Sequence, residues 1–472
     1  MKPVALSRIA QWTGGRLLEA TGADDAGHDV LIDAIATDTR TLDASDGRAA
    51  LFVALKGERF DAHAHVGDAV DAGARALLVA RPVDAAVPQV VVADTERALA
   101  AFAAAMQHTR SGKLIAITGS NGKTSVKTLL LSILQRAAAA SGGVAYANPG
   151  NRNNEIGLPL AVLDAPEDAL YAIYEMGAGK PGDIAYLTAI ARPDVALVNN
   201  VAPAHLERMG SLLGVADTKG AIYDALPSGG VAVINADDAF APYFAERAHG
   251  RRLIRFGLEA TADVSARTLV ADGEGTRFVL VTPAGECDVA LALPGRHNVL
   301  NALAAASLAL GVGASLDAIR EGLEAARSVA GRLVTHRLEN GAILIDDSYN
   351  ANPGSLNAAI DTLAAARGNN WLVLGDMREL GVDAEALHAE AGRRAKAAGI
   401  ARLLTLGPLS AAAAEAFGVG ARHFETHDAL ASALRDALTA DVRVLVKGSR
   451  GSAMDKVVRA LLPPTGDATH AA

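Results

Sequence analysis

The 472-residue chain has little cysteine, few aromatic residues and no excess of positive charge. Its one cysteine, Cys287, cannot form an internal disulfide or a cluster of thiolate metal ligands. The 53 acidic residues outnumber the 44 basic ones, which disfavours a nucleic-acid-binding protein because such proteins need a basic face. No apolar run reaches the roughly 18 residues of a membrane span, and the first residues lack the layout of a signal peptide. We therefore expect a soluble, cytoplasmic protein with no nucleic-acid partner and no membrane span.

The chain is long enough for about three domains. Apolar runs alternate with alanine-rich helical stretches, which is typical of parallel sheets covered by helices on both faces. We predict an α/β protein with an N-terminal α/β domain over residues 1–111, a central domain over 112–328 and a C-terminal, Rossmann-like doubly wound domain over 329–472. Residues 111–113 are predicted to form the first hinge.

Buried strands define the predicted sheets. They lie at 51–55, 76–79 and 90–92 in the N-terminal domain, at 114–118, 171–174, 195–198 and 231–234 in the central domain, and at 342–345, 371–374, 402–405 and 442–446 in the C-terminal domain. Three extended segments between 264 and 293 predict a small antiparallel appendage to the mostly parallel central sheet.

A glycine-rich loop follows the strand at 114–118 and precedes a predicted helix, which is the context that a phosphate-binding loop requires. Small residues let backbone N–H groups converge on an anion, and the helix N-terminus adds its positive end. Lys123 would neutralise phosphate oxygens and Thr124 would ligate Mg²⁺, although Ile117 stands where the full G-x-x-x-x-G-K-[ST] pattern has its first glycine. The predicted nucleotide-binding residues of the loop are Gly119, Ser120, Asn121, Gly122, Lys123 and Thr124.

Nucleotide binding alone leaves several classes of enzyme open. A switch GTPase needs an N-K-x-D motif, and no N-K dipeptide occurs in the chain. A dehydrogenase needs G-x-G-x-x-G after a strand, whereas the G-V-G at 311–313 follows a helix and lacks the third glycine. Kinases, motor ATPases and ATP-driven ligases remain at this point.

The loop and a set of further motifs, in fixed order over nearly the whole chain, resemble the Mur ligases, the ATP-dependent amide-forming enzymes of peptidoglycan precursor synthesis. The motifs are D-T-R (38–40), L-F-V-A-L-K-G-E-R-F-D (51–61), T-G-S-N-G-K-T (118–124), N-N-E-I-G-L-P (153–159), E-M-G (175–177), A-H-L-E (204–207), Lys219, N-A-D-D (235–238), G-R-H-N (295–298), G-R (331–332), D-D-S-Y-N-A-N-P (346–353), L-G-D-M-R-E-L (374–380) and K-G-S-R (447–450). The D-N-P-R type motif of the diamino-acid-adding branch is absent. The set is therefore similar to the branch that adds a dipeptide.

The resemblance implies a reaction and its small-molecule partners. These are ATP with Mg²⁺, UDP-N-acetylmuramoyl-tripeptide and D-alanyl-D-alanine, joined through an acyl phosphate. It implies that Lys123 and Arg332 act on the ATP phosphates, that Asn298 contacts the adenine and that Asp347 holds the ribose. The implied metal ligands are Thr124, Glu175, His205 and Lys219, the last as a carbamate, and the catalytic set is Lys123, Lys219, His205 and Arg332. Ala221 departs from the K-x-E pattern that usually surrounds this lysine.

Candidate substrate contacts complete the predicted site. Basic groups and close backbone suit a diphosphate, which favours Thr39, Arg40, Lys56 and Gly57 for the UDP end. The resemblance assigns Asn153 and Asn154 to the muramoyl-peptide. Candidates for the dipeptide are Asn350, Asn352, Ser355, Lys447 and Arg450. We expect a monomer, and the third peptide residue stays open between diaminopimelate and lysine.

Overall fold

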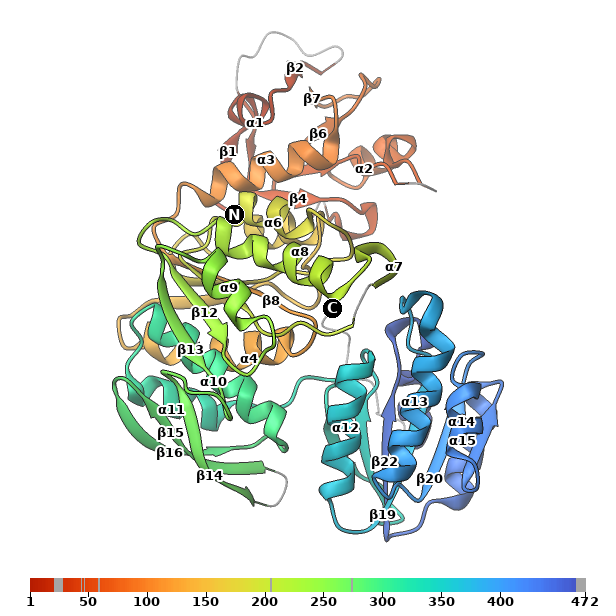
Figure 1. Ribbon diagram of the computed structural model, residues 1–472. Helices are drawn as coiled ribbons and strands as arrows, with labels where there is room; N and C mark the ends of the chain where they lie inside the picture. Colours follow the sequence, from red (N-terminus) through yellow and green to blue (C-terminus); the bar gives the residue numbers. More distant parts are fainter. Residues whose placement is uncertain are drawn as a thin grey trace.

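In the computed structural model, the chain folds into three α/β regions that follow one another along the sequence (Figure 1). It describes residues 1–20, 29–43, 45, 47–57, 60–203, 206–272 and 275–463. None of the helices in these ranges is both long and apolar enough to cross a bilayer.

The N-terminal region contains a five-stranded sheet in which only the edge strand β2 is antiparallel to its neighbour. The strand order is β2 (Arg16–Leu18), β7 (Gln89–Val91), β6 (Ala76–Val79), β5 (Ala50–Val53) and β4 (Ala34–Ala36), while β1 (Val4–Ala5) pairs with β3 (Leu31–Ile32). The helical segments are α1 (Leu6–Thr13), η1 (Thr39–Thr41), η2 (Ala62–His65), α2 (Val66–Asp71) and α3 (Thr95–Gln107).

The central region is built on a parallel sheet with strand β8 in its interior. The strand order is β13 (Arg252–Phe256), β12 (Val231–Asn235), β11 (Val195–Val198), β8 (Lys113–Thr118), β10 (Ala169–Glu175) and β9 (Val144–Ala147). Its helices are α4 (Lys123–Ala139), α5 (Gly157–Asp164), α6 (Asp183–Ala191), α7 (Leu206–Met209), α8 (Leu212–Asp224), α9 (Ala241–Arg247), α10 (Arg296–Gly311) and α11 (Leu316–Ala325). The antiparallel appendage consists of β14 (Ser265–Asp272), β15 (Gly275–Thr282) and β16 (Gly285–Leu291).

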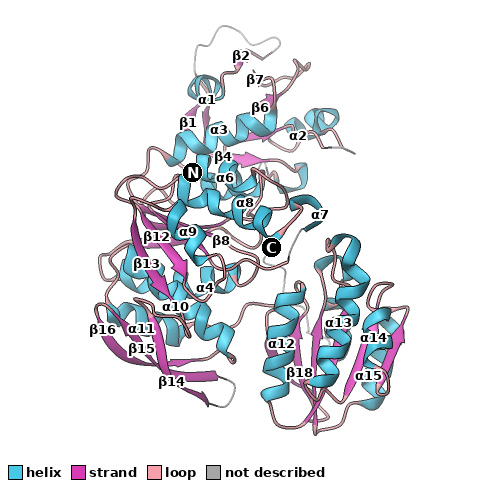
Figure 2. Ribbon diagram, in the orientation of Figure 1, coloured by secondary structure: helices cyan, strands magenta, loops and turns pink. Residues whose placement is uncertain are grey.

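The C-terminal region is a second six-stranded sheet with helices on its faces (Figure 2). The strand order is β17 (Val334–Arg337), β18 (Ile343–Asp347), β22 (Val442–Lys447), β19 (Asn369–Gly375), β20 (Arg402–Leu406) and β21 (Ala421–Phe424), with only β17 antiparallel to its neighbour. The helical segments are α12 (Pro353–Ala365), η3 (Gly381–Asp383), α13 (Ala384–Ala397), α14 (Ala411–Phe417), α15 (His427–Ala437), η4 (Arg450–Ser452) and α16 (Asp455–Leu461).

Alternation along the strands builds a core on each face of the two larger sheets, because successive side chains point to opposite faces. In β8, Ile115 belongs to the cluster that contains α4 and α10, whereas Ala116 belongs to the opposite cluster. That opposite cluster continues into the N-terminal region, where it includes Leu99 and Phe102 of α3. The C-terminal region has two clusters of its own.

The predicted fold class is confirmed, including the antiparallel appendage and the doubly wound C-terminal sheet. The strands that were not predicted are short or lie at sheet edges, such as β9 and β21, whose side chains are mostly exposed or only partly buried. Gly112, predicted as part of a hinge, is closely packed instead, because a Cβ there would lie 2.1 Å from the Ala169 carbonyl oxygen.

Candidate active site

The glycine-rich loop joins the carboxyl end of β8 to α4, at the point where the order of the central sheet reverses direction. Ligands of open α/β sheets bind at this switch point. Gly122 has φ +78°, and a Cβ there would lie 2.4 Å from Asn301 Oδ1 and 2.6 Å from Asn199 Nδ2. The position therefore requires glycine for both backbone conformation and space.

Asparagines after β11 hold this loop in shape. The Asn121 N–H donates to Asn200 Oδ1 (2.8 Å), and Asn199 Nδ2 donates to the Asn121 carbonyl (2.9 Å). The Ser120 N–H also donates to the Asn200 carbonyl (3.0 Å). With these bonds the loop is organised by the protein itself, so that a phosphate would meet a preformed site.

Two lysines point at one carbonyl of the loop. Lys123 Nζ donates to the Gly119 carbonyl at 2.7 Å, and Lys219 Nζ, from α8, donates to the same oxygen at 3.2 Å. Burial lowers the pKa of both ammonium groups, and repulsion from Lys123 lowers the pKa of Lys219 further. Among the described residues no carboxylate forms an ion pair with Lys219, which is only 2% exposed. The structure thus places a buried amine with a lowered pKa beside the phosphate loop.

Glu175 ends β10 next to this loop and is 3% exposed. Its carboxylate accepts from Thr124 Oγ1 (2.9 Å) and Asn153 Nδ2 (2.9 Å), and it forms an ion pair with Lys127 (3.2 Å). Burial alone would raise the pKa of Glu175, but the charges of Lys127 and Lys123 and the two hydrogen bonds together lower it. The carboxylate is therefore ionised at neutral pH.

Lys127 is a site residue that the sequence analysis missed. It is buried in α4, and its Nζ also donates to the carbonyls of Asn148 (2.9 Å) and Gly150 (3.0 Å). Its position four residues after Lys123 puts both lysines on one helix face. That spacing was a signal available in the sequence.

Oxygen ligands for Mg²⁺ are present beside the loop. The Thr124 hydroxyl and the Glu175 carboxylate touch each other, and this pair fits a cation that keeps several waters and phosphate oxygens in its coordination shell. Within the described ranges no three His, Cys, Asp or Glu residues cluster as a metal site. His205, a predicted ligand, lies outside the described residues. Lys219 as an ammonium group could not ligate a cation.

The C-terminal region supplies the other wall of the site. Arg332 Nη2 donates to Thr124 Oγ1 (3.0 Å), and its guanidinium lies 4.4 Å from the centre of the Tyr349 ring. Asp347 forms an ion pair with the buried Lys447. Burial raises the pKa of Asp347, and Lys447 partly offsets this increase. Tyr349, which the sequence analysis did not single out, thus orients the arginine that reaches the loop.

Two cavities meet at this wall. The smaller, of about 280 Å³, contains the phosphate loop, Asn298, Asp347 and Lys447. The larger, of about 710 Å³, contains Glu175 and opens between the central and C-terminal regions. The residues that line both are Ser120, Lys123, Arg332, Tyr349, Asn350 and Asn352. The larger cavity also contains Asn153, Asn154, Lys180, Arg208, Arg378 and Arg450.

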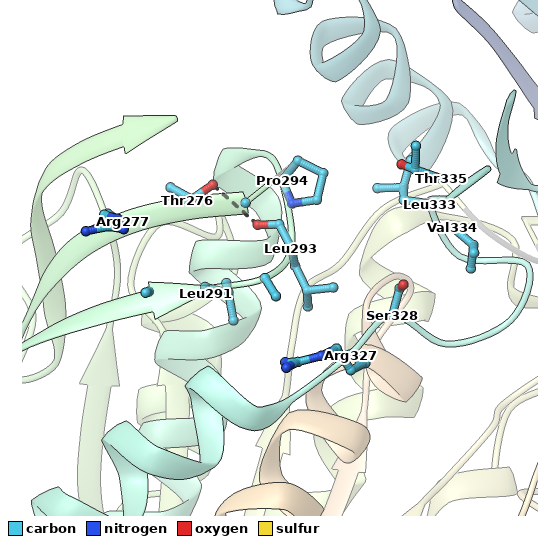
Figure 3. Close-up of a pocket in the computed structure, with 13 residues that line it drawn as sticks. Thr276, Arg277, Leu291, Leu293, Pro294, Arg327, Ser328, Leu333, Val334 and Thr335 are labelled. Carbon is cyan, nitrogen blue, oxygen red and sulfur yellow. Dashed lines mark hydrogen bonds between the residues drawn. The ribbon is translucent and has the colours of Figure 1, made fainter. Parts of the chain in front are cut away.

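A third cavity, of about 490 Å³, lies between the ends of β15 and β16 and the linker at 327–335 (Figure 3). Arg277 and Arg327 line it from the central region, and Thr335 lines it from the C-terminal region. None of the predicted site residues lines this cavity, although it shares Leu293, Arg327, Ser328 and Leu333 with the smaller cavity described above.

The predicted substrate residues are distributed unevenly. Asn352 and Ser355 form the N-terminal capping box of α12, so their side chains already have partners. Arg40 is exposed and paired with Asp38 (2.6 Å). Thr39 and Arg40 follow β4, and Lys56 and Gly57 follow the adjacent parallel strand β5, so all four lie at one edge of the N-terminal sheet. They line neither of the two joined cavities, and their UDP role stays a prediction.

Comparisons with known proteins agree over almost the full chain. The model of the Mur ligase middle domain matches residues 117–309, and the model of the Mur ligase glutamate ligase domain matches residues 331–450. The UDP-N-acetylmuramoyl-tripeptide–D-alanyl-D-alanine ligase of Escherichia coli (strain K12) is 45% identical over 98% of this chain and 99% of that protein. The crystal structure of MurF from Acinetobacter baumannii is 33% identical, with a TM-score of 0.90 over 98% of this chain and 99% of that one. The structure of MurF ligase from Thermotoga maritima in complex with ADP is 26% identical, with a TM-score of 0.81 over 91% of this chain and 96% of that one.

Proposed function

The chain belongs to the Mur ligase family, and from this premise we propose that it adds D-alanyl-D-alanine to UDP-N-acetylmuramoyl-tripeptide, driven by ATP. The product is the UDP-linked pentapeptide of peptidoglycan synthesis. ATP and a UDP-linked substrate place this reaction in the cytoplasm. We retain the domain bounds 1–111, 112–328 and 329–472 as part of this proposal.

The observation that carries the proposal is the junction of the two cavities at Lys123 and Arg332. A nucleotide in the smaller cavity would direct its terminal phosphate toward this junction. A peptide carboxylate in the larger cavity would approach the same point. A ligase needs such an arrangement because two anions must come together before the first bond forms.

The chemistry then runs in two steps. A carboxylate oxygen of the tripeptide attacks the γ-phosphorus, and ADP leaves, giving an acyl phosphate. The dipeptide amine attacks the carbonyl carbon, a proton is released to solvent, and inorganic phosphate leaves. Lys123, Arg332 and the backbone N–H groups at the start of α4 bind the phosphate oxygens. Thr124 and Glu175 would hold Mg²⁺, which supplies further neutralisation of phosphate charge when bound.

The proposed roles of the remaining nucleotide residues follow from the smaller cavity. Asn298 is buried at the N-terminus of α10, where its Nδ2 donates to the Pro294 carbonyl (2.8 Å) and its carbonyl oxygen accepts from Asn301 (3.5 Å). We assign it to the adenine. The Asp347 carboxylate, oriented by Lys447, is assigned to the ribose.

Phosphate release from ATP with UDP-N-acetylmuramoyl-tripeptide, with and without D-alanyl-D-alanine, tests the function. We expect release only when both are present, together with a pentapeptide product by mass spectrometry. Release with a dipeptide-stage acceptor and a diamino acid would assign the chain to the diamino-acid-adding branch instead. Comparing tripeptides that end in diaminopimelate and in lysine identifies the accepted third residue.

Lys219 is proposed to react as a neutral amine with CO₂: its nitrogen bonds to the carbon, a proton is released to solvent, and the resulting carbamate offers an anionic oxygen ligand. Its lowered pKa supports this, because only the free amine is nucleophilic. In Lys219→Ala we expect activity to fall at least 100-fold and to be partly restored by a short-chain carboxylic acid. Lys127→Ala is the matched control: it removes another buried lysine of the site, so the acid should give no rescue. Full activity of Lys219→Ala without acid would refute the carbamate.

A further inference from the structure

Asn352 connects the C-terminal region to the phosphate loop through its side-chain amide. Its Oδ1 accepts from the Ser355 N–H (2.9 Å) and so caps α12, while its Nδ2 donates to Asn121 Oδ1 (2.7 Å) across the boundary between the two regions. We propose that Asn352 is a latch, a positioning residue that couples docking of the C-terminal region to the nucleotide-binding shape of the loop, and not a contact for the dipeptide.

The geometry fixes which way both amides face. A helix N-cap must accept a hydrogen bond from the backbone, so Asn352 Oδ1 is the atom that faces Ser355. Its Nδ2 is then directed outward as a donor, and the atom of Asn121 that it meets must be an acceptor. The Asn121 backbone N–H and carbonyl are already bonded to the asparagines after β11. The side-chain carbonyl is therefore the group that Asn121 offers to the other region.

The surrounding packing brings the two groups together. Asn352 is 8% exposed, so little of it is in contact with bulk water. Gly354 follows in the first turn of α12, and a Cβ there would lie 3.2 Å from Asn121 Nδ2 and 3.4 Å from Ala202 Cβ. This glycine lets the helix end approach the loop closely.

The latch differs from the second hydrogen bond across this boundary, which Arg332 donates to Thr124. Arg332 is assigned to the γ-phosphate, so that bond must give way when ATP binds. Asn352 contacts the turn of the loop at Asn121 and keeps its bond while the phosphate is bound. The inference rests on the proposed function in assigning the nucleotide to the smaller cavity.

Asn352→Ser separates the latch from the cap. Serine caps helices as well as asparagine does, so we expect an unchanged melting temperature, but serine lacks the donor that reaches Asn121. The measurement that tests this is binding of the non-hydrolysable analogue AMP-PNP with Mg²⁺ by calorimetry, without tripeptide or dipeptide. Loss of one buried hydrogen bond predicts about 3- to 10-fold weaker binding. The distance between dyes on the central and C-terminal regions should lengthen on average.

A double-mutant cycle with Asn121→Ala tests the contact from its other side. Asn121→Ala should weaken AMP-PNP binding to a similar degree, and the double variant should be no weaker than either single variant, because both remove the same bond. Additive losses would overturn the latch. So would unchanged AMP-PNP binding in Asn352→Ser together with a raised KM for D-alanyl-D-alanine, which would make Asn352 a dipeptide contact. If the unmodified chain fails to bind AMP-PNP, the proposed function itself falls.

Discussion

The central region meets its two neighbours in different ways. Toward the N-terminal region it shares one apolar core, in which Phe102 and Leu99 of α3 belong to the same cluster as Leu158 and Leu187 of the central helices. Toward the C-terminal region, hydrogen bonds from Arg332 and Asn352 reach the phosphate loop. Apolar burial is non-directional, and separating the two regions would expose the whole shared core to water. Single hydrogen bonds can instead be broken and remade individually. We infer that the first two regions form one rigid body and that the third docks reversibly over the nucleotide.

Breaking the shared core should have the largest effect. Phe102 is fully buried, so Phe102→Ala should cost about 3–5 kcal/mol of unfolding free energy. Calorimetry should show the N-terminal and central regions melting earlier, together, in one transition. Phe417→Ala is the control, because this residue lies in the separate core of the C-terminal region and should lower only a second transition. Separate melting of the first two regions in Phe102→Ala would contradict a shared body.

Arg332→Lys tests the polar side of the comparison. Lysine keeps the charge but loses the planar group that reaches Thr124 while lying over Tyr349. We expect kcat to fall about 100-fold or more, as when one donor to a transition-state anion is removed. Both melting transitions should stay within about 1 °C of the unmodified protein. A normal kcat would mean that this arginine serves docking alone.

Acid should weaken the polar junction. His297 lies at the start of α10, and a Cβ on Gly295 would contact both its ring (2.8 Å) and Thr362 Oγ1 of α12 (3.0 Å). Burial, and then the charge of Lys447, lower the pKa of His297 to about 4. The docked state favours the neutral ring, so its full stability is present above the free histidine pKa of about 6.5. As the pH falls from 6.5 toward 4, the undocked state gains a proton first, and the stability of the docked state is lost.

The expected loss of docking free energy over that range is about 2 kcal/mol, because the ring keeps some solvent access. Interdomain dye distances measured from pH 7.5 to 5 should lengthen, and His297→Gln should remove most of this dependence. Glu175 does not contribute over this range, because its lowered pKa means that the carboxylate is protonated only below about pH 4.5. An unchanged pH profile in His297→Gln would exclude the histidine as the cause.

The sequence predicted the regular parts of both junctions and little of their detail. Periodicity found β8, α4 and the C-terminal sheet, because buried parallel strands are continuous apolar runs. Motif order found Lys123, Glu175 and Arg332. It could not show that Lys127 pairs with Glu175, since that contact joins α4 to the second strand that follows it in the chain. Nor could it show that Asn352 donates to Asn121, because that contact depends on how the C-terminal region docks.

Gly354→Ala is expected to have the smallest effect. It should leave stability unchanged or raise it while weakening nucleotide binding, so the two effects can be told apart. Alanine in place of glycine near a helix start stabilises by about 0.5–1 kcal/mol where there is room for it. Gly67 is the matched control, because it is also the second residue of its helix and a Cβ there would have nothing within 4 Å. Gly67→Ala should therefore raise the first melting transition and leave AMP-PNP binding unchanged. Gly354→Ala should keep or raise the C-terminal transition yet weaken AMP-PNP binding about 3-fold, because its Cβ presses on Asn121. If both variants bound the analogue normally, close approach of α12 to the loop would not matter for nucleotide binding, and the contrast between the two junctions would rest on Arg332 alone.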